Sequence, residues 1–107
     1  MRIAYIINHR GETGLNGVVM DLVKVMMEHG HECSVYYLCE NPDKESNVLK
    51  FPCKTGKLDL LKGRLDWGQF DVVHSNGLRP DVFVMLHKPL RTRTLFVSTI
   101  HCYVFQD

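Results

Sequence analysis

Residues that could bind or orient a substrate gather in three short stretches of the sequence. These are residues 8–17, with Arg10, Gly11, Gly14, Asn16 and Gly17; residues 74–77, with His74 and Asn76; and residues 99–101, which end in His101. Glycines let a ligand approach the backbone closely. A helix that begins just after such a loop points its free N–H groups, and the positive end of its dipole, at the same space. The three stretches therefore predict a site for a hydroxyl-rich or anionic ligand.

His74 and His101 are the candidates for chemistry. A single histidine at a strand end is more often a hydrogen-bonded structural residue, whereas two histidines that face one crevice favour a functional interpretation. Neither Ser75 nor Cys102 lies in a G-x-S-x-G context, so the sequence does not indicate a covalent nucleophile.

The elements that must position these residues alternate between strand and helix patterns. We expect strands at 2–8, 33–38, 48–51, 70–74 and 92–100, and helices at 18–29, 58–65 and 81–88. Asn16 is the predicted N-cap of the first helix, Gly30 its predicted C′ residue and Pro80 the predicted first residue of the last helix. The strand at 48–51 is predicted to lie at an edge, because Pro52 interrupts it.

This order predicts a one-domain α/β fold, a Rossmann-like parallel sheet with helices on both faces and the strand order 3-2-1-4-5. Such sheets bind ligands beyond the carboxyl ends of their strands, at the switch point between the first and fourth strands. The three polar stretches follow the first, fourth and fifth strands, which places all of them at that edge.

Composition excludes several classes of protein. The chain has 107 residues, of which 45% are apolar and 23% charged, and its 13 lysines and arginines nearly balance its 12 acidic residues. This balance gives no support for nucleic-acid binding. Between positions 79 and 93 the sequence has four cations, Arg79, Lys88, Arg91 and Arg93, but a single acidic residue, Asp81. This excess of positive charge indicates either a solvated surface or a contact with an anionic partner or lipid. No apolar run reaches the 18 residues of a membrane span, so any membrane contact is expected to be peripheral.

Cysteines and histidines indicate neither disulfides nor a metal. The cysteines at 33, 39, 53 and 102 form no C-x-x-C pair and follow no secretory signal, which predicts a reducing, cytoplasmic compartment, and Cys33 is expected in the core. His29 and His31 could be a metal pair, but no third ligand lies near them in the sequence. We therefore expect no metal.

A dinucleotide cofactor is the obvious alternative for a glycine loop after a leading strand. The glycines here read G-x-x-G-x-x-G rather than G-x-G-x-x-G, although Glu40 stands where an acidic ribose ligand would. The phosphate-binding G-x-x-x-x-G-K-[ST] motif is absent from the sequence. A dinucleotide-dependent oxidoreductase thus stays an alternative.

Four segments together resemble the family 4 glycosyltransferases. Residues 17–22 are similar to the family's G-G-A-E-R-V-V-x-D-L-A stretch, and residues 29–35 to its R-G-H-E-V-x-V stretch. Residues 70–81 are similar to D-V-V-H-x-H-G-x-R-x-D, and residues 98–101 to S-T-x-H. The resemblance spans nearly the whole chain in the right order. Three positions depart from the pattern, namely Thr13, Gly17 and Asn76, where the family often has glycine, arginine and histidine.

The resemblance implies one lobe of a GT-B architecture. Residues 1–107 would be its N-terminal, acceptor-side lobe, itself incomplete, and the C-terminal donor lobe that holds the nucleotide sugar would lie outside them. By position, Gly14 would let acceptor and donor phosphates come near the backbone, His101 would lie beside the reacting sugar and His74 would shape the acceptor pocket. The nucleotide-sugar donor is a substrate, so no cofactor is implied.

The implied activity is transfer of a hexosyl unit from a nucleotide sugar to an acceptor hydroxyl, with retention at the anomeric carbon. The acceptor would be a sugar or lipid-linked molecule in polysaccharide or glycolipid synthesis at the cytoplasmic face of a membrane. Because groups from the other lobe must stabilise the departing diphosphate, the 107 residues are expected to be inactive by themselves. The alternative from another class is a Rossmann-like binding module without catalysis.

Overall fold

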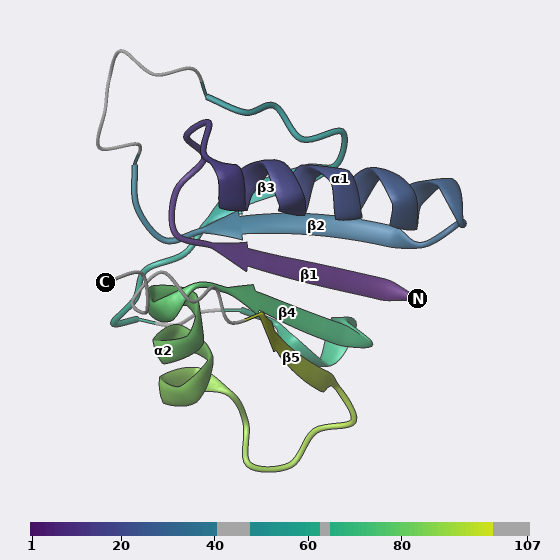
Figure 1. The fold of residues 1–107 in the computed structure, drawn as a ribbon. Helices are drawn as coiled ribbons and strands as arrows, with labels where there is room; N and C mark the ends of the chain where they lie inside the picture. Colours follow the sequence, from purple (N-terminus) through teal and green to yellow (C-terminus); the bar gives the residue numbers. More distant parts are fainter. Residues whose placement is uncertain (41–47, 63–64, 100–107) are drawn as a thin grey trace, which may run out of the picture.

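The computed structural model describes residues 1–40, 48–62 and 65–99, and Figure 1 traces their path. Its elements, in chain order, are β1 (Arg2–Ile7), α1 (Gly14–Glu28), β2 (Glu32–Tyr37), β3 (Lys54–Lys57), the 3-10 helix η1 (Trp67–Gln69), β4 (Val72–Asn76), α2 (Leu78–His87) and β5 (Leu95–Thr99). The strands form one parallel sheet in the order β3-β2-β1-β4-β5. This confirms the predicted fold class and strand order.

The central strand, β1, is apolar because both of its faces are covered. Successive side chains of a strand point to opposite faces. Ile3, Tyr5 and Ile7 accordingly pack into one core cluster, whereas Ala4 and Ile6 pack into another. A strand buried on two sides reads as a continuous apolar run, as the sequence of β1 does.

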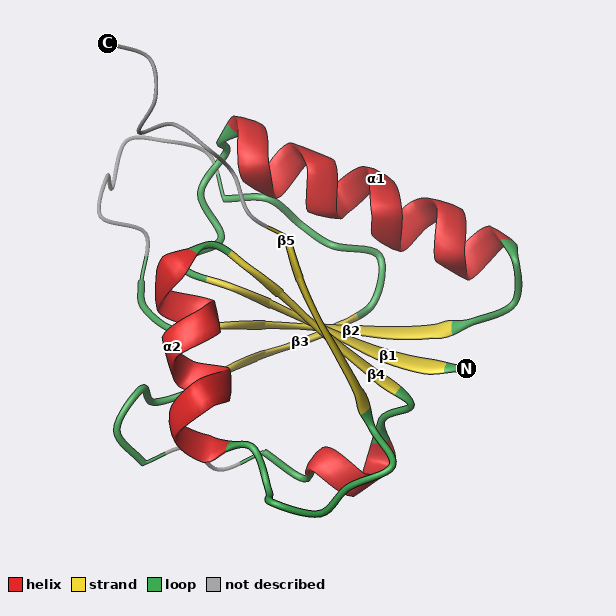
Figure 2. Cartoon of the chain, turned by 60° about the horizontal axis from the view of Figure 1, so that its bottom comes forward, coloured by secondary structure: helices red, strands yellow, loops and turns green. Residues whose placement is uncertain are grey.

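One helix covers each face of the sheet, as Figure 2 shows. α1 buries Val19 and Val23 in the cluster with Tyr5, and α2 buries Phe83 and Val84 in the opposite cluster. Trp67 of η1 extends the second cluster, with its ring centroid 5.8 Å from that of Phe83. The prediction of helices on both faces is confirmed.

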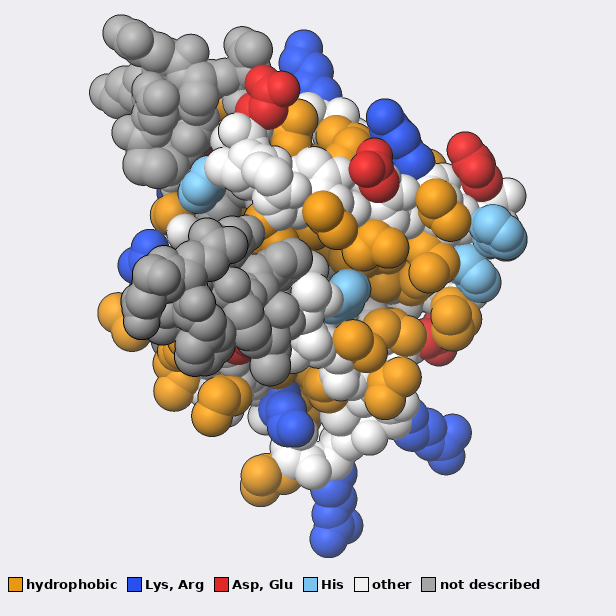
Figure 3. All heavy atoms as spheres, viewed as in Figure 1, with side chains coloured by type: hydrophobic (Ala, Val, Ile, Leu, Met, Phe, Trp, Pro, Cys, Tyr) orange, Lys and Arg blue, Asp and Glu red, His pale blue; other side chains and the backbone are white. Residues whose placement is uncertain are grey.

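The α1 side of β5 is open among the described residues. Val97 pairs in register with His74, whose ring contacts Tyr5 on the α1 side, and both Leu95 and Val97 are exposed there. Apolar side chains form a continuous band below α1 in the view of Figure 3. None of the helices in the described part of the chain is long and apolar enough to cross a membrane.

The third strand does not lie where the sequence predicted it. It is Lys54–Lys57 rather than 48–51. Val48 forms only an isolated antiparallel bridge to Gly11, and Phe51 is buried in the α1-side core. The apolar run thus packs against the sheet instead of joining it. β3 is polar because it is an edge strand, and edge strands with lysines resist unwanted pairing, so an apolar pattern could not reveal it.

The helix predicted at 58–65 is absent from the described residues of that segment. Leu58 is buried, but Leu61 is exposed, so the two leucines do not share one buried face. Asp59 instead accepts hydrogen bonds from the backbone N–H groups of Leu61 and Lys62 at 2.8 and 3.1 Å, which closes a turn. The same two bonds lower the pKa of the Asp59 carboxyl.

The predicted helix boundaries need smaller corrections. α1 begins at Gly14, and its N-cap is Thr13 rather than Asn16, because the Thr13 hydroxyl accepts from the Asn16 backbone N–H at 3.2 Å. Gly30 follows the helix with φ +85°, as a C′ glycine should. α2 begins at Leu78, so Pro80 is its third residue; a first-turn proline removes no helical hydrogen bond.

Candidate functional site at the carboxyl edge of the sheet

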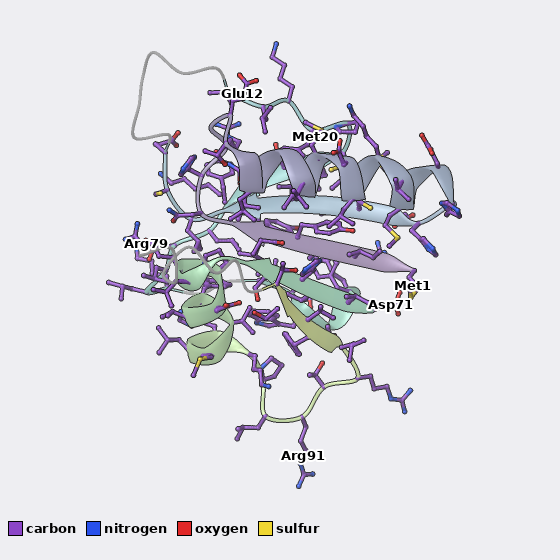
Figure 4. The ribbon with its side chains drawn as sticks, in the orientation of Figure 1. Met1, Glu12, Met20, Asp71, Arg79 and Arg91 are labelled. Atoms are coloured by element: carbon purple, nitrogen blue, oxygen red, sulfur yellow. The ribbon has the colours of Figure 1, made fainter. Side chains whose placement is uncertain are left out.

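Most of the predicted site residues meet at one edge of the sheet. The loop after β1, the start of α1 and the junction between β4 and α2 all lie beyond the carboxyl ends of the strands. β1 pairs with β4 directly, and Ile6 aligns with Ser75, so the loops that follow these strands are neighbours. In Figure 4, Glu12 and Arg79 mark this end of the molecule, and Met1 and Asp71 mark the opposite end. The predicted catalytic residue His101 lies outside the described residues.

Asn16 holds the loop that follows β1. Its buried side-chain amide donates to the backbone oxygens of His9 and Gly11, both at 2.7 Å. A third hydrogen bond, within the loop itself, runs from the Gly11 N–H to Nδ1 of His9 at 2.9 Å. The amide nitrogen of Asn16 is therefore engaged within the protein, and it fixes the shape of the loop on which a ligand would rest.

Gly14 and Gly17 lie in the first turn of α1, where nothing in the described structure requires glycine. Neither has a positive φ, and a Cβ added at either position would meet no atom within 4 Å. Backbone conformation and internal packing thus both allow a side chain. A side chain at either position would instead hinder a ligand that approaches the N-terminus of the helix from outside, where free N–H groups favour anions.

Arg10 is oriented by an aromatic ring. Its guanidinium carbon lies 4.2 Å from the centroid of the Tyr37 ring, and Nη2 lies 4.0 Å from a carboxylate oxygen of Glu40. Glu40 also pairs with Lys57, at 3.4 Å. Stacking on Tyr37 directs Arg10 toward the ends of β2 and β3 and away from β4. A pre-oriented guanidinium suits recognition of a phosphate or carboxylate.

β4 presents His74 on the same face of the sheet as α1, from the middle of the strand rather than from its end as the sequence predicted. Its ring contacts the Tyr5 ring, with centroids 5.5 Å apart, and its Nε2 is hydrogen-bonded to the hydroxyl of Thr99. Burial raises the pKa of Tyr5 to about 12, so that phenol stays neutral beside the imidazole. Thr99 ends β5, two positions before His101 in the sequence. His74 thus ties the middle of β4 to the end of β5.

Asn76 is buried and points back along its own strand. Its amide nitrogen donates to the backbone oxygen of His74 at 3.1 Å. Gly77 then turns the chain into α2 with φ +103°, a conformation that glycine alone adopts readily. The side chain of Asn76 therefore supports the junction, whose backbone forms part of the edge.

Sequence reasoning missed a hollow at the ends of β2 and β3. It has a volume of about 600 Å³ and is lined by Leu38, Cys39, Glu40, Lys57, Leu58, Asp59, Leu60, Leu61 and Arg79. Lys57 and Arg79 bring positive charge to it, and Glu40 and Asp59 bring carboxylates. Such a mixed lining suits a ligand with hydroxyls and an anionic group. Lys57 escaped notice because it belongs to the unpredicted β3. Arg79 was interpreted as one member of a basic cluster and as part of the 70–81 segment, and neither interpretation placed it beside β2 and β3.

Asp81 joins α2 to the sheet from the other face. Its Oδ1 accepts hydrogen bonds from the Ser75 and Ser98 hydroxyls, at 2.5 and 2.8 Å. These bonds link α2 to both β4 and β5, and they orient the helix whose first turn carries Arg79. The sequence analysis matched Asp81 only as the last residue of the 70–81 segment. Its two partners become apparent in the structure, because the pairing of β4 with β5 places Ser75 beside Ser98.

Two other observations bear on ligands. A second hollow, of about 380 Å³, includes Arg2, His31 and Lys54 and lies at the amino ends of the strands, away from the predicted site residues. Within residues 1–40, 48–62 and 65–99, no three His, Cys, Asp or Glu side chains come together in a way that could hold a metal ion.

Comparison with known proteins adds a whole-chain similarity. No family model and no solved structure matches this sequence. Two curated proteins of Escherichia coli, both named O-antigen biosynthesis glycosyltransferase WclY, are each 35% identical to it over 112 aligned residues. The alignments cover 100% of this chain but 30% of each relative, so the chain spans less than a third of their length. The sequence is thus similar to one part of a glycosyltransferase of O-antigen biosynthesis.

Proposed function

We propose that this chain forms the acceptor-side part of a glycosyltransferase that acts in the biosynthesis of a surface polysaccharide such as O-antigen. The reaction is transfer of a hexosyl unit from a nucleotide sugar to an acceptor hydroxyl. The observation that carries the proposal is the 35% identity over the entire chain to the two WclY proteins. The parallel sheet with order 3-2-1-4-5, consistent with a GT-B lobe, supports it independently.

The carboxyl edge supplies suitable groups for the acceptor. Gly14 and Gly17 leave the start of α1 open, so a phosphate or sugar can reach those first-turn N–H groups that Thr13 does not engage. Arg10, held on Tyr37, and the cations of the hollow, Lys57 and Arg79, can contact an anionic part of a sugar or lipid-linked acceptor. His74, in the middle of β4, is hydrogen-bonded to Thr99 at the end of β5, so it can shape the pocket for the sugar.

The finer assignments rest on the four segments that resemble family 4 glycosyltransferases. They place His101 beside the reacting sugar and imply retention at the anomeric carbon. In this scheme the nucleotide sugar is held by a donor lobe beyond these 107 residues, which by themselves do not catalyse transfer. Stabilisation of the leaving diphosphate then comes from that lobe.

Neither alternative is favoured. A dinucleotide-dependent oxidoreductase lacks the G-x-G-x-x-G spacing, and both relatives are named as transferases. A binding module without catalysis has no observation in its favour over a transferase lobe.

The test is transfer by the full-length protein, supplied with a panel of nucleotide sugars and the cell's lipid and saccharide fractions as acceptors. We expect nucleoside diphosphate release and labelled product from at least one donor, and loss of turnover by at least tenfold in His101→Ala with unchanged circular dichroism. Absence of turnover with every donor would contradict the proposed class of enzyme. Normal turnover in the His101 variant would contradict only the role of that residue.

The glycine loop can be tested in the same assay. Gly14→Leu places a bulky side chain at the open start of α1, and we expect a higher KM for the acceptor with little change in folding. Lys24→Leu, at an exposed position of the same helix, is the matched control and should leave KM unchanged. Equal kinetics in the two variants would show that no substrate approaches Gly14.

A further inference from the structure

Two cysteines that are distant in the sequence lie side by side where β2 and β3 begin. Ser34 of β2 is aligned with Lys54 of β3, and the residues that precede this pair are Cys33 and Cys53, both free thiols. Neighbouring strands run about 4.8 Å apart. A disulfide needs its Cα atoms at about 4.4 to 6.8 Å. The pairing of β2 with β3 therefore brings the two cysteines to a spacing at which they can be joined.

The two side chains also lie on the same face of the sheet. Cys33 belongs to the α1-side core cluster, and Cys53 packs against that cluster. Sγ of Cys33 lies 4.0 Å from the backbone oxygen of Val23 in α1, which is a weak contact. A turn of the Cys33 side chain toward Cys53 thus sacrifices no strong hydrogen bond.

A hollow gives small reagents access to the pair. Both cysteines line the hollow of about 380 Å³ at the amino ends of the strands, the end that Met1 and Asp71 mark in Figure 4. Cys33 is 8% exposed and Cys53 is half-buried, so a reagent meets Cys53 first. Lys54 lines the same hollow and supplies positive charge for an acidic reagent.

Burial keeps both thiols protonated at neutral pH. It raises the pKa of Cys33, and it raises the pKa of Cys53 to about 11. Because the thiolate is the nucleophile, neither thiol reacts quickly with an electrophile that it meets once. The nearness of a second thiol matters more, because it can trap a mixed disulfide as soon as one forms.

Cys39 is excluded as a partner by its position. It follows β2, six residues beyond Cys33, and an extended strand covers about 20 Å over that length. Its Sγ lies 3.3 Å from the backbone oxygen of Asn8, at the carboxyl end of β1. Cys39 is therefore a matched control on the same side of the chain break that separates Cys33 from Cys53 in a tryptic digest.

We propose that Cys33 and Cys53 form a redox modification site, which a small disulfide such as oxidised glutathione converts into a disulfide bond between β2 and β3. The Cys53 thiolate attacks one sulfur of the reagent, which gives a mixed disulfide and releases one glutathione thiol. The Cys33 thiolate then attacks the Cys53 sulfur and releases the second. Two protein thiols are oxidised, and one glutathione disulfide is reduced to two thiols that carry the two protons.

The bond would affect β3 most. This strand has four residues, lies at the edge of the sheet and pairs only with β2. Such edge strands open more easily than central ones. A covalent bond at its first residue's neighbour, Cys53, would hold β3 on the sheet, including Lys57 at its other end.

Peptide mapping of the full-length protein tests the proposal. The folded protein is incubated with oxidised glutathione, its remaining thiols are blocked with iodoacetamide, and it is digested with trypsin without reduction. We expect fragment 51–54, which carries Cys53, to be joined to fragment 25–44, which carries Cys33 and Cys39. Dithiothreitol should separate the two fragments.

Variants assign the bond to one cysteine of fragment 25–44. Cys39→Ser should still give the joined fragments, whereas Cys33→Ala should give none and should keep the circular dichroism of the unchanged protein. Amide hydrogen exchange at residues 54–57 should slow by at least about tenfold in the oxidised protein, but not in Cys33→Ala treated in the same way. No sugar donor is involved, so these outcomes are independent of the proposed transfer reaction.

Three results would overturn the proposal. The first is absence of the joined fragments from the folded protein, including the case in which Cys53 carries glutathione alone. The second is their formation only after unfolding in urea, because the fold would then not bring the thiols together. The third is a joined product that survives in Cys33→Ala, because Cys39 would then be the partner.

Discussion

The two junctions that join a central strand to a helix use glycine for different reasons. At the junction of β4 and α2, Gly77 has φ +103°, and a Cβ there would lie 3.6 Å from Leu15 and 3.8 Å from Pro80. At the junction of β1 and α1, Gly14 and Gly17 have ordinary φ values and open space around them. The fold thus explains Gly77, but it leaves the other two glycines to be explained by something outside the described residues. We take the junction of β4 and α2 as structural and the junction of β1 and α1 as the proposed ligand-binding surface.

The largest effect on stability is expected at the structural junction. Gly77→Val places a β-branched residue at a φ and ψ that are essentially restricted to glycine, and it should lower the free energy of unfolding by about 3 kcal/mol. Urea denaturation followed by circular dichroism measures this loss. The comparison of the two junctions would fail if Gly14→Val were as destabilising.

The loop after β1 is expected to depend on Asn16 rather than on its glycines. Asn16→Ala leaves the carbonyl oxygens of His9 and Gly11 without their donor and should cost about 2 kcal/mol, because buried acceptors lose their hydrogen bonds. Thr13→Ala, which removes only the helix cap, is the matched variant and should cost about 1 kcal/mol. A smaller loss for Asn16→Ala than for Thr13→Ala would contradict the bracing role. Urea denaturation gives both values.

The bonds of Asp81 should matter less, because this carboxylate is only partly buried. Asp81→Ala removes the acceptor for the hydroxyls of Ser75 and Ser98, and we expect a loss of about 1 kcal/mol. Asp21→Ala, at an exposed position of α1, should change stability by less than about 0.5 kcal/mol. Thermal unfolding of the two variants side by side is the measurement, and equal melting temperatures would mean that these bonds do not secure α2.

The smallest effect on stability is expected for Gly14→Ala, although this substitution should still change the kinetics of transfer. The free space around Gly14 and the better helix propensity of alanine predict a change between zero and about 1 kcal/mol of stabilisation. Acceptor KM in the transfer assay should nevertheless rise. Destabilisation by this substitution would show that the fold itself needs Gly14, and the contrast with Gly77 would then disappear.

The similarity to WclY sharpens the same comparison. Those proteins are named for O-antigen biosynthesis, and this chain matches 30% of their length. If the site needs groups from outside these residues, we expect its surface to be open here and some of its residues to have no structural role within this part of the chain. The unexplained glycines, the oriented Arg10 and the polar hollow near Arg79 all lie at the carboxyl edge, where such groups would meet them.

Sequence patterns predicted the elements whose signals are local and repeated. The continuous apolar run of β1, the helical spacing of Val19 and Val23, and the capping glycine Gly30 each mark an element without reference to the rest of the chain. Two predictions failed where the signal was not local. β3 is polar because it lies at the edge of the sheet, and the leucines at 58 and 61 have helical spacing but different burial.

The sequence by itself determined the α/β class, the strand order and the placement of residues 8–17 and 74–77 at one edge. It could do so because strand alternation, helix spacing and the handedness of crossovers restrict the topology. Tertiary structure decided what each polar side chain does there. Asn16 holds a loop, Arg10 stacks on Tyr37 and His74 reaches Thr99 because strands distant in sequence became neighbours. Such contacts depend on the pairing of the whole sheet, which no local pattern encodes.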